Sequence, residues 1–239
     1  MKKILISLMT VTCLLWAVSA LAIPTLQLDI SDGVYVGAPE ETVFSTSDSF
    51  TLYALLNQPG DYSGTFYVSA AVTPAFSEPL SPAPDLGSFT FAGQEIKVTE
   101  GMVWGTPPVD VVEDVAKNDD LPSHGAFPTY FTSFEFTFDE NSTVAAYDVE
   151  ASYTDPAYVG PSGEYLYCKA FDVDVSGLVD GYEIHFDLYN LNADGSVDQS
   201  APFSHDAQSG GTPVPEPSTL LLLGAGLVGL GGWARKFRR

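Results

Sequence analysis

The sequence predicts an all-β domain, an antiparallel β-sandwich of jelly-roll type, with one apolar segment at each end of the chain. Short runs of alternating apolar and polar residues recur between residues 23 and 206, and clusters of Gly, Pro, Asp and Ser separate them. No stretch between these runs has the helical periodicity that a βαβ fold requires. The roughly 195 residues between the apolar ends suit a single domain with one core.

The first 22 residues have the pattern of a secretory signal peptide. Lys2 and Lys3 form a positive start, residues 4–18 are an apolar run, and Ala20–Ala22 fits the small-x-small cleavage pattern. An uncleaved membrane anchor is the alternative, but the short apolar core and the cleavage pattern favour removal. The sequence therefore predicts export through the secretion translocon and processing by signal peptidase.

The first half of the domain contains five expected strands. Thr25–Ile30 alternates, with its leucines and isoleucine on one face. Phe50–Leu56 is short and apolar, and Gly64–Val72 is rich in aromatic and β-branched residues. Ser88–Phe91 and Glu95–Val98 flank an Ala-Gly-Gln connection, which predicts a tight turn.

The second half contains four more expected strands. Phe131–Phe138 has the clearest alternation, with phenylalanines at every second position after Ser133, so one face should lie in the core. Ala145–Ser152 and Glu164–Val175 follow. In Tyr182–Tyr189, two acidic residues and a histidine fill the alternate polar positions. The pattern thus predicts eight to ten short strands.

Three stretches lack strand patterns. Residues 73–87 are rich in Pro, Ser and Ala and predict a long surface loop; a boundary between two small domains is the alternative. Residues 105–128 are irregular and acidic. Residues 207–217 are small, polar and Pro-containing, which suits a linker between the domain of residues 23–206 and the membrane.

The charge of the chain is divided sharply between its parts. Between the two apolar ends, three lysines (Lys97, Lys117 and Lys169) stand against all 31 acidic residues, a formal charge of −28. Such a surface repels phosphate backbones, so we exclude nucleic acid as a partner. It also keeps the domain soluble and attracts cations.

The C-terminal segment has three parts in a fixed order. The motif Pro215-Glu216-Pro217 comes first, and an uncharged apolar stretch, residues 218–234, follows it. As a helix at ~1.5 Å per residue this stretch spans about 25 Å, somewhat less than the ~30 Å hydrocarbon core of a bilayer. A basic cluster of Arg235, Lys236, Arg238 and Arg239 ends the chain.

The basic cluster predicts the orientation of this transmembrane helix. Positive residues stay on the cytoplasmic side, whereas the signal peptide sends the acidic domain outward. Both ends of the chain therefore predict a domain outside the membrane and residues 235–239 inside.

These three parts together closely resemble the PEP-CTERM sorting signal. The resemblance rests on Val214–Thr219, the Leu- and Gly-rich segment of residues 220–232, and the terminal basic cluster. It implies that exosortase, an integral-membrane cysteine transpeptidase, is a partner and cleaves near Pro215-Glu216-Pro217. It further implies delivery to the cell surface or extracellular matrix, where carriers of this signal are commonly linked to exopolysaccharide and biofilm.

The acidic domain also resembles, more loosely, the choice-of-anchor extracellular domains that carry interchangeable sorting tails. The segments that suggest this are residues 26–30, 124–131 and 201–207. The resemblance implies no activity for the domain.

Asn190, Asn192, Asp194 and Asp198 partly fit a calcium-binding loop. They place oxygen side chains at positions 1, 3, 5 and 9, with a glycine at position 6. Position 12 is Ala201 rather than the bidentate glutamate, which would weaken the affinity. The alternative is a turn built on the Asp-Gly pair after the preceding strand. Calcium is the one cofactor that the sequence suggests.

No pattern in the domain predicts a catalytic residue. The three histidines, His124, His185 and His205, fall in a loop, on a polar strand face and in another loop, and a zinc site would require several of them to converge. Ser204 beside His205-Asp206 lacks both a nucleophile elbow and an oxyanion loop, so we reject a catalytic triad. Asp172 and Asp174 alternate on one strand and are most simply solvent-facing.

We therefore expect an exported, non-enzymatic surface or matrix protein, anchored first in the inner membrane and then released to the surface. Two alternatives stay open: an extracytoplasmic glycan-active enzyme, and a calcium-dependent adhesion module. A cleft with two facing carboxylates would favour the enzyme. A smooth sandwich would favour the structural or binding protein.

Overall fold

The computed structural model describes residues 23–37, 41–57, 61–107 and 127–210. The expected signal peptide, the linker from residue 211 onward, the apolar stretch and the basic cluster lie outside these residues. Within them, no helix is both long and apolar enough to cross a bilayer.

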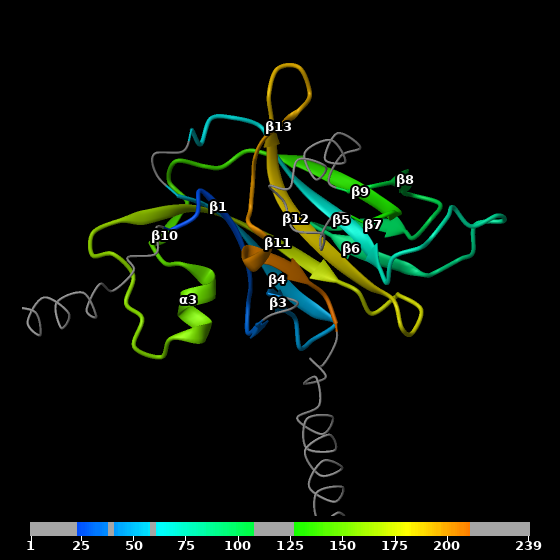
Figure 1. The fold of residues 1–239 in the computed structure, drawn as a ribbon, viewed down its shortest axis with the longest axis horizontal. Coiled ribbons are helices and arrows are strands. Elements are labelled where there is room, and N and C mark those ends of the chain that lie inside the picture. The colour runs from blue at the N-terminus through cyan, green and yellow to red at the C-terminus, as the bar shows by residue number, and fades with distance from the viewer. Residues whose placement is uncertain (1–22, 38–40, 58–60, 108–126, 211–239) are drawn as a thin grey trace, which may run out of the picture.

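The described residues form two β-sheets packed face to face (Figure 1). The first sheet has the order β1-β4-β11-β6-β7, and β10 also pairs with β11. All its pairs are antiparallel. Its strands are β1 (Leu26–Ile30), β4 (Ser49–Asn57), β6 (Ser88–Phe91), β7 (Gln94–Lys97), β10 (Thr143–Ala145) and β11 (Tyr165–Asp174).

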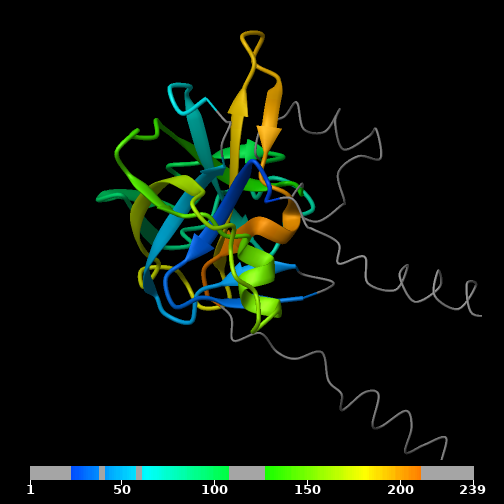
Figure 2. The ribbon, with the colours of Figure 1, turned by 90° about the vertical axis from the view of Figure 1, so that its left-hand side faces the viewer.

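The second sheet has eight strands in the order β2-β3-β14-β12-β5-β9-β8, and β13 also pairs with β12. Its strands are β2 (Val34–Val36), β3 (Thr42–Phe44), β5 (Phe66–Thr73), β8 (Val103–Gly105), β9 (Thr129–Phe136), β12 (Glu183–Leu191), β13 (Val197–Ser200) and β14 (Asp206–Gln208). The pair β3–β14 is parallel, so this sheet is mixed. The view in Figure 2 shows the layers from the side, with the β12–β13 hairpin projecting beyond them.

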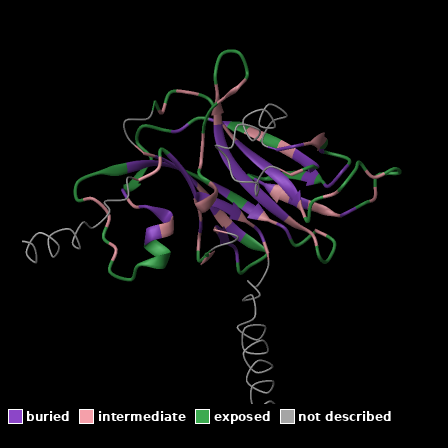
Figure 3. Ribbon diagram, viewed as in Figure 1, coloured by how far each residue is buried: buried purple, intermediate pink, exposed green. Residues whose placement is uncertain are grey.

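The core lies between the sheets, where Figure 3 shows the buried residues concentrated along the central strands. Leu26, Leu28 and Ile30 on β1 are almost fully buried, as the alternation of that segment predicts. A group of phenylalanines joins the two layers. Phe91 on β6 stacks on Phe134 of β9 with ring centroids 4.1 Å apart.

The predicted all-β class is confirmed, and most expected strands are present. The described residues contain fourteen strands rather than eight to ten, because three-residue strands such as β2, β3 and β14 carry too few residues to show a period. Of the loop expected over residues 73–87, residues 74–87 form an irregular connection between β5 and β6.

The strand expected over Ala145–Ser152 is wrong. The chain leaves β10 at Ala145 and forms a short helix, α3 (Val149–Thr154). Asp148 is the N-cap: its backbone is extended, and its side chain accepts a hydrogen bond from the amide of Ala151. A local cap thus turns an apparently alternating segment into a helix, whose start lies close to the outer face of β1.

Candidate functional site

The outer face of β12 carries two buried polar residues. Ile184, Phe186 and Leu188 point into the core and are fully buried. Because side chains alternate along a strand, His185 and Asp187 point to the opposite face. They are nevertheless only 5% and 9% exposed. The sequence placed these residues on the polar face of the strand, and their burial is a finding of the structure.

A third acidic residue reaches the same place from the C-terminal end of the domain. β14 pairs with β12 through His185↔Gln208 and Phe186↔Ala207, which sets Asp206 and Gln208 on the outer face. The Nε2 atom of His185 lies 3.4 Å from Oδ1 of Asp187 and 3.4 Å from Oδ2 of Asp206. The donor atoms of the three residues all lie within 4.8 Å of one another. We call His185, Asp187 and Asp206 the His-Asp-Asp cluster.

The two carboxylates control the protonation of the imidazole. Burial by itself lowers the pKa of a histidine, but the charges of Asp206 and Asp187 outweigh it and raise the pKa of His185 to about 9. The distances of 3.4 Å exceed those of a charge-assisted hydrogen bond, about 2.7–2.9 Å. The cluster therefore has an imidazole nitrogen held between two carboxylates, an arrangement whose chemistry can hold either a proton or a cation.

Neighbouring groups orient His185. Its Nδ1 lies 3.4 Å from Oε1 of Gln208, and the ring of Phe127 packs edge-on, with centroids 6.1 Å apart. Among the described residues, Nε2 of His185 and Oδ2 of Asp187 are buried and make no hydrogen bond. Both atoms thus have unused hydrogen-bonding or coordinating capacity, and Nε2 of His185 lies beside both carboxylates.

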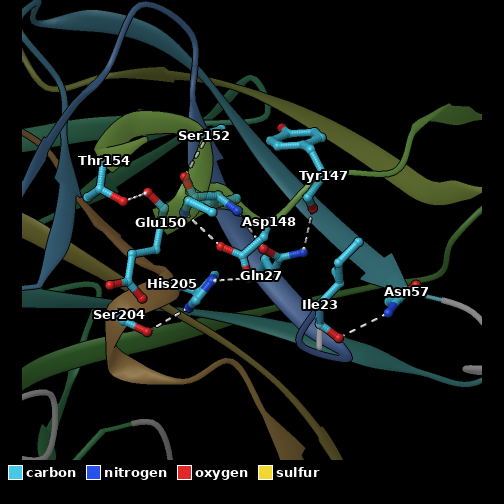
Figure 4. Close-up of polar contacts among 12 residues, drawn as sticks. Ile23, Gln27, Asn57, Tyr147, Asp148, Glu150, Ser152, Thr154, Ser204 and His205 are labelled. Carbon is cyan, nitrogen blue, oxygen red and sulfur yellow. Dashed lines mark hydrogen bonds and ion pairs between the residues drawn. The ribbon is translucent and has the colours of Figure 1, made fainter. Parts of the chain in front are cut away.

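The second described histidine belongs to a different network, shown in Figure 4. His205 ends a 3₁₀ turn, η1 (Phe203–His205), and is 3% exposed. Its Nε2 lies 3.4 Å from Oδ2 of Asp148, and its Nδ1 lies 2.7 Å from the hydroxyl of Ser204. The structure thus adds Asp148 to the pair Ser204–His205, a partner that the sequence does not suggest.

This second network fastens α3 to the rest of the domain. Oε1 of the fully buried Gln27 accepts a hydrogen bond from the amide of Val149, and its Nε2 donates to the carbonyl of Tyr147. Asp148 uses one carboxylate oxygen for the helix cap and the other for His205. Both carboxylate oxygens of Asp148 therefore make contacts that hold the fold together, which supports the rejection of a catalytic triad here.

We expect Asp148→Ala to lower the free energy of unfolding by about 2–4 kcal/mol. The lost N-cap accounts for about 1 kcal/mol. The buried imidazole of His205, left without its acceptor, accounts for about 1–3 kcal/mol. Urea unfolding monitored by circular dichroism measures the change.

Asp148→Asn is the matched control, since asparagine also caps helices but carries no charge. It should retain the capping contribution and lose only the pairing with His205. Although burial raises the pKa of Asp148, its contacts with His205 and Ala151 outweigh this, and the pKa is lowered. The ionised carboxylate of Asp148 therefore stabilises the folded state. This stabilisation is fully present above the unfolded pKa of about 3.9 and is lost as the pH falls through the lower pKa of the folded state. Asp148→Asn lacks this carboxylate and should be the less acid-sensitive protein. Equal stability of Asp148→Ala and wild type would contradict the network.

The expected calcium-loop residues lie in the β12–β13 hairpin. Nδ2 of Asn190 donates to Oδ2 of Asp198 over 3.1 Å, and Nδ2 of Asn192 donates to the hydroxyl of Ser196 over 3.1 Å. Oδ1 of Asp194 accepts from the amide and hydroxyl of Ser196. The turn expected as the alternative is therefore present, and calcium binding at this turn stays a prediction.

Other residues singled out in the sequence lie apart from the His-Asp-Asp cluster. Asp172 is exposed on β11, as expected, and the sorting motif and basic cluster lie outside the described residues. His124 is also outside them. Trp104 on β8, a further aromatic residue of the second sheet, is half-buried and packs against Tyr130 with ring centroids 5.2 Å apart.

Sequence reasoning missed the His-Asp-Asp cluster, although two signals for it were present. A histidine and an aspartate two residues apart on one strand, as in His185-x-Asp187, share a face. His205-Asp206 supplied a second acidic group next to a histidine. What the sequence did not contain was the pairing of β14 with β12, which brings these segments together.

Comparison with known families supports the C-terminal assignment. Residues 213–239 match the family model of the PEP-CTERM protein-sorting motif. The motif predicted from the sequence is thereby confirmed, and it implies an exported protein that exosortase sorts from the membrane to the surface. Searches of curated proteins and of solved structures gave no match. The resemblance of the domain to choice-of-anchor domains stays a prediction.

Proposed function

We propose that this exported, exosortase-sorted chain is a non-enzymatic surface or matrix protein whose acidic β-sandwich acts by binding, with exopolysaccharide as the ligand class. The observation that carries this proposal is the PEP-CTERM motif over residues 213–239, which begins three residues after the described domain ends at residue 210. The motif accounts for the destination of the domain, and the properties of the domain itself have to account for its task.

The carboxylates of the domain support a role other than glycan hydrolysis. A hydrolase needs a general acid with a raised pKa next to a second carboxylate. Asp172 and Asp174 line a surface hollow of about 530 Å³, and Asp174 is not such an acid. Hydrogen bonds from Ser176 and Ser49 lower the pKa of Asp174 and engage both of its oxygens.

The pKa of Asp29 is shifted upward, opposite to that of Asp174, but both of its carboxylate oxygens also accept hydrogen bonds. Burial raises the pKa of Asp29, even though the hydroxyls of Tyr147 and Tyr153 and the amide of Ile30 hydrogen-bond to its oxygens. Because these neighbours occupy both oxygens, the group is poorly placed to donate a proton to a substrate. A structural role for Asp29 fits the non-enzymatic proposal.

Aromatic side chains offer one surface for sugars. Phe76, Trp104 and Tyr182 are half-buried, and together with Tyr130 they form a group of packed rings at one end of the second sheet. Sugar rings stack on exposed aromatic faces, whereas the formal charge of −28 between the two apolar ends of the chain favours neutral or cation-bridged glycans over strongly anionic ones.

The sorting part is tested by replacing Pro215, Glu216 and Pro217 together with alanine in the producing cell. The expected result is retention of the full-length chain in the membrane fraction and loss of the surface form. Replacing Gly211 and Thr212 with alanine is the matched control, because it alters the neighbouring residues and leaves the triad intact. Unchanged processing of the triple variant would refute sorting by exosortase.

The binding part is tested by incubating the purified full-length chain with a panel of polysaccharides. Sedimentation with a neutral glycan, weakened in Trp104→Ala at a temperature well below the melting temperature of that variant, is the expected result. Release of reducing ends from any glycan would instead favour the enzyme. Binding that requires added calcium, and that Asp194→Asn abolishes, would favour the adhesion module.

A further inference from the structure

We propose that His185, Asp187 and Asp206 form a binding site for one divalent transition-metal ion of the zinc class. This inference goes beyond the proposed surface function and does not depend on it. The three residues come from β12 and β14, and no motif in the sequence brings them together. The argument rests on their donor types, their spacing and their burial.

The donor types select the ion. An imidazole nitrogen and two carboxylate oxygens are ordinary zinc ligands, and three protein ligands with a fourth position for water are a common zinc arrangement. Calcium prefers six to eight oxygen ligands, and magnesium prefers oxygen with several retained waters. A site with one imidazole and two carboxylates therefore favours zinc over both.

The spacing fits tetrahedral coordination. Zinc bonds to nitrogen and oxygen measure about 2.0–2.2 Å, which places neighbouring ligand atoms of a tetrahedron about 3.3–3.6 Å apart. The two separations from Nε2 of His185, to Asp187 and to Asp206, are both 3.4 Å. An octahedral magnesium site with bonds of 2.0–2.1 Å would require about 2.8–3.0 Å instead.

Burial supplies the independent observation that points to a ligand. The side chain of His185 is 6% exposed, and its Nε2 atom points between the two carboxylates without making a hydrogen bond to any described residue. Buried polar atoms without a hydrogen bond are uncommon and call for a bound partner. A divalent cation with two carboxylates sums to zero charge, so the occupied site can be buried at lower cost than separate ions.

Gln208 already contacts the imidazole at the ring nitrogen that faces away from the ion. Metal-bound histidines usually contact an acceptor through the other ring nitrogen, and Gln208 lies at Nδ1 of His185. When the ion binds, it replaces the proton that the carboxylates otherwise hold on the ring, because a coordinating imidazole is neutral.

The ion would hold β14 against β12, because it would coordinate residues from both strands. β14 has three residues and is the last strand among the described residues, which end shortly before the sorting motif, and the ion would tie it to the long central strand β12. Zinc would thus stabilise the end of the domain from which the sorting segment leaves. Its effect is structural, and it should appear as a change in thermal stability.

The test uses the purified full-length chain in mild detergent, stripped with a chelator and then titrated with Zn²⁺ in excess Mg²⁺ to displace ions from the acidic surface. We expect one zinc per chain and a rise in Tm of about 5–10 °C at about 100 times the Kd. Ca²⁺ should not reproduce the rise. No stoichiometric zinc, or a rise that Mg²⁺ alone produces, would overturn the proposal.

Variants locate the site. His185→Gln and Asp206→Asn should weaken zinc binding by more than about 100-fold, since loss of a residue that only hydrogen-bonds to a metal ligand already costs about 10–100-fold. Asp172→Asn, an exposed carboxylate on the other sheet, is the matched control and should bind as the wild type does. Equal binding by all four proteins would assign the ion to the acidic surface and overturn the site.

A spectroscopic readout covers the case in which the variants do not fold. Co²⁺ replaces zinc and absorbs visible light much more strongly in four-coordinate than in six-coordinate sites. The wild-type chain should give the strong tetrahedral band, and Zn²⁺ should abolish it. The weak spectrum of six-coordinate Co²⁺ would overturn the proposal even without any variant.

Discussion

Replacing Phe91 with alanine should lower the free energy of unfolding by about 3–5 kcal/mol, the usual loss for a fully buried phenylalanine. Phe91 is 1% exposed and contacts rings from both sheets. Its centroid lies 4.1 Å from that of Phe134 and 6.2 Å from that of Phe186 across the core, and 4.9 Å from that of Phe171 in its own sheet. Truncation therefore opens a cavity between the layers as well as removing apolar contacts.

Phe91→Leu and Tyr165→Ala are the controls for this prediction. Leucine should restore most of the stability because it fills much of the volume. Tyr165 is 40% exposed, so its truncation should cost less than about 1 kcal/mol. Equilibrium unfolding in urea measures all three changes. A loss for Phe91→Ala no larger than that for Tyr165→Ala would show that the two sheets do not pack through this ring.

Replacing Gly87 with alanine should cost about 2–5 kcal/mol, from two separate causes. Gly87 has φ +88°, a region that costs an L-residue about 1–2 kcal/mol. A Cβ atom at this position would also lie 2.1 Å from the carbonyl oxygen of Gly177. Backbone cannot rotate aside as a side chain can, so the chain has to shift, at a further cost of about 1–3 kcal/mol.

Gly93→Ala separates the two causes. Gly93 has nearly the same φ, +80°, but a Cβ atom there meets nothing within 4 Å. Gly93→Ala should therefore lower the free energy of unfolding only by the conformational term, about 1–2 kcal/mol. The difference in melting temperature between the two variants measures the clash with Gly177. Identical melting temperatures would mean that the contact between Gly87 and Gly177 is looser than the structure has it.

The alternation of residues predicted the core side of the sandwich well. Residues of β1 and β9 that share a phase in the sequence share the buried face in the structure, as Leu26, Leu28 and Phe136 illustrate. This works because the two-residue period of a strand is a local property of its backbone. The prediction failed over residues 145–152, where the cap at Asp148 favours a helix over the weak apolar pattern.

By itself, the sequence determined the all-β class, the large negative charge and the PEP-CTERM motif, because periodicity, charge and a contiguous motif are all written in neighbouring residues. Only the tertiary structure decided that the polar face of β12 is buried. Alternation tells which residues share a face but not what covers that face. The pairing of β14 with β12 brings Asp206 to His185 and Asp187, and such a long-range contact has no local signature.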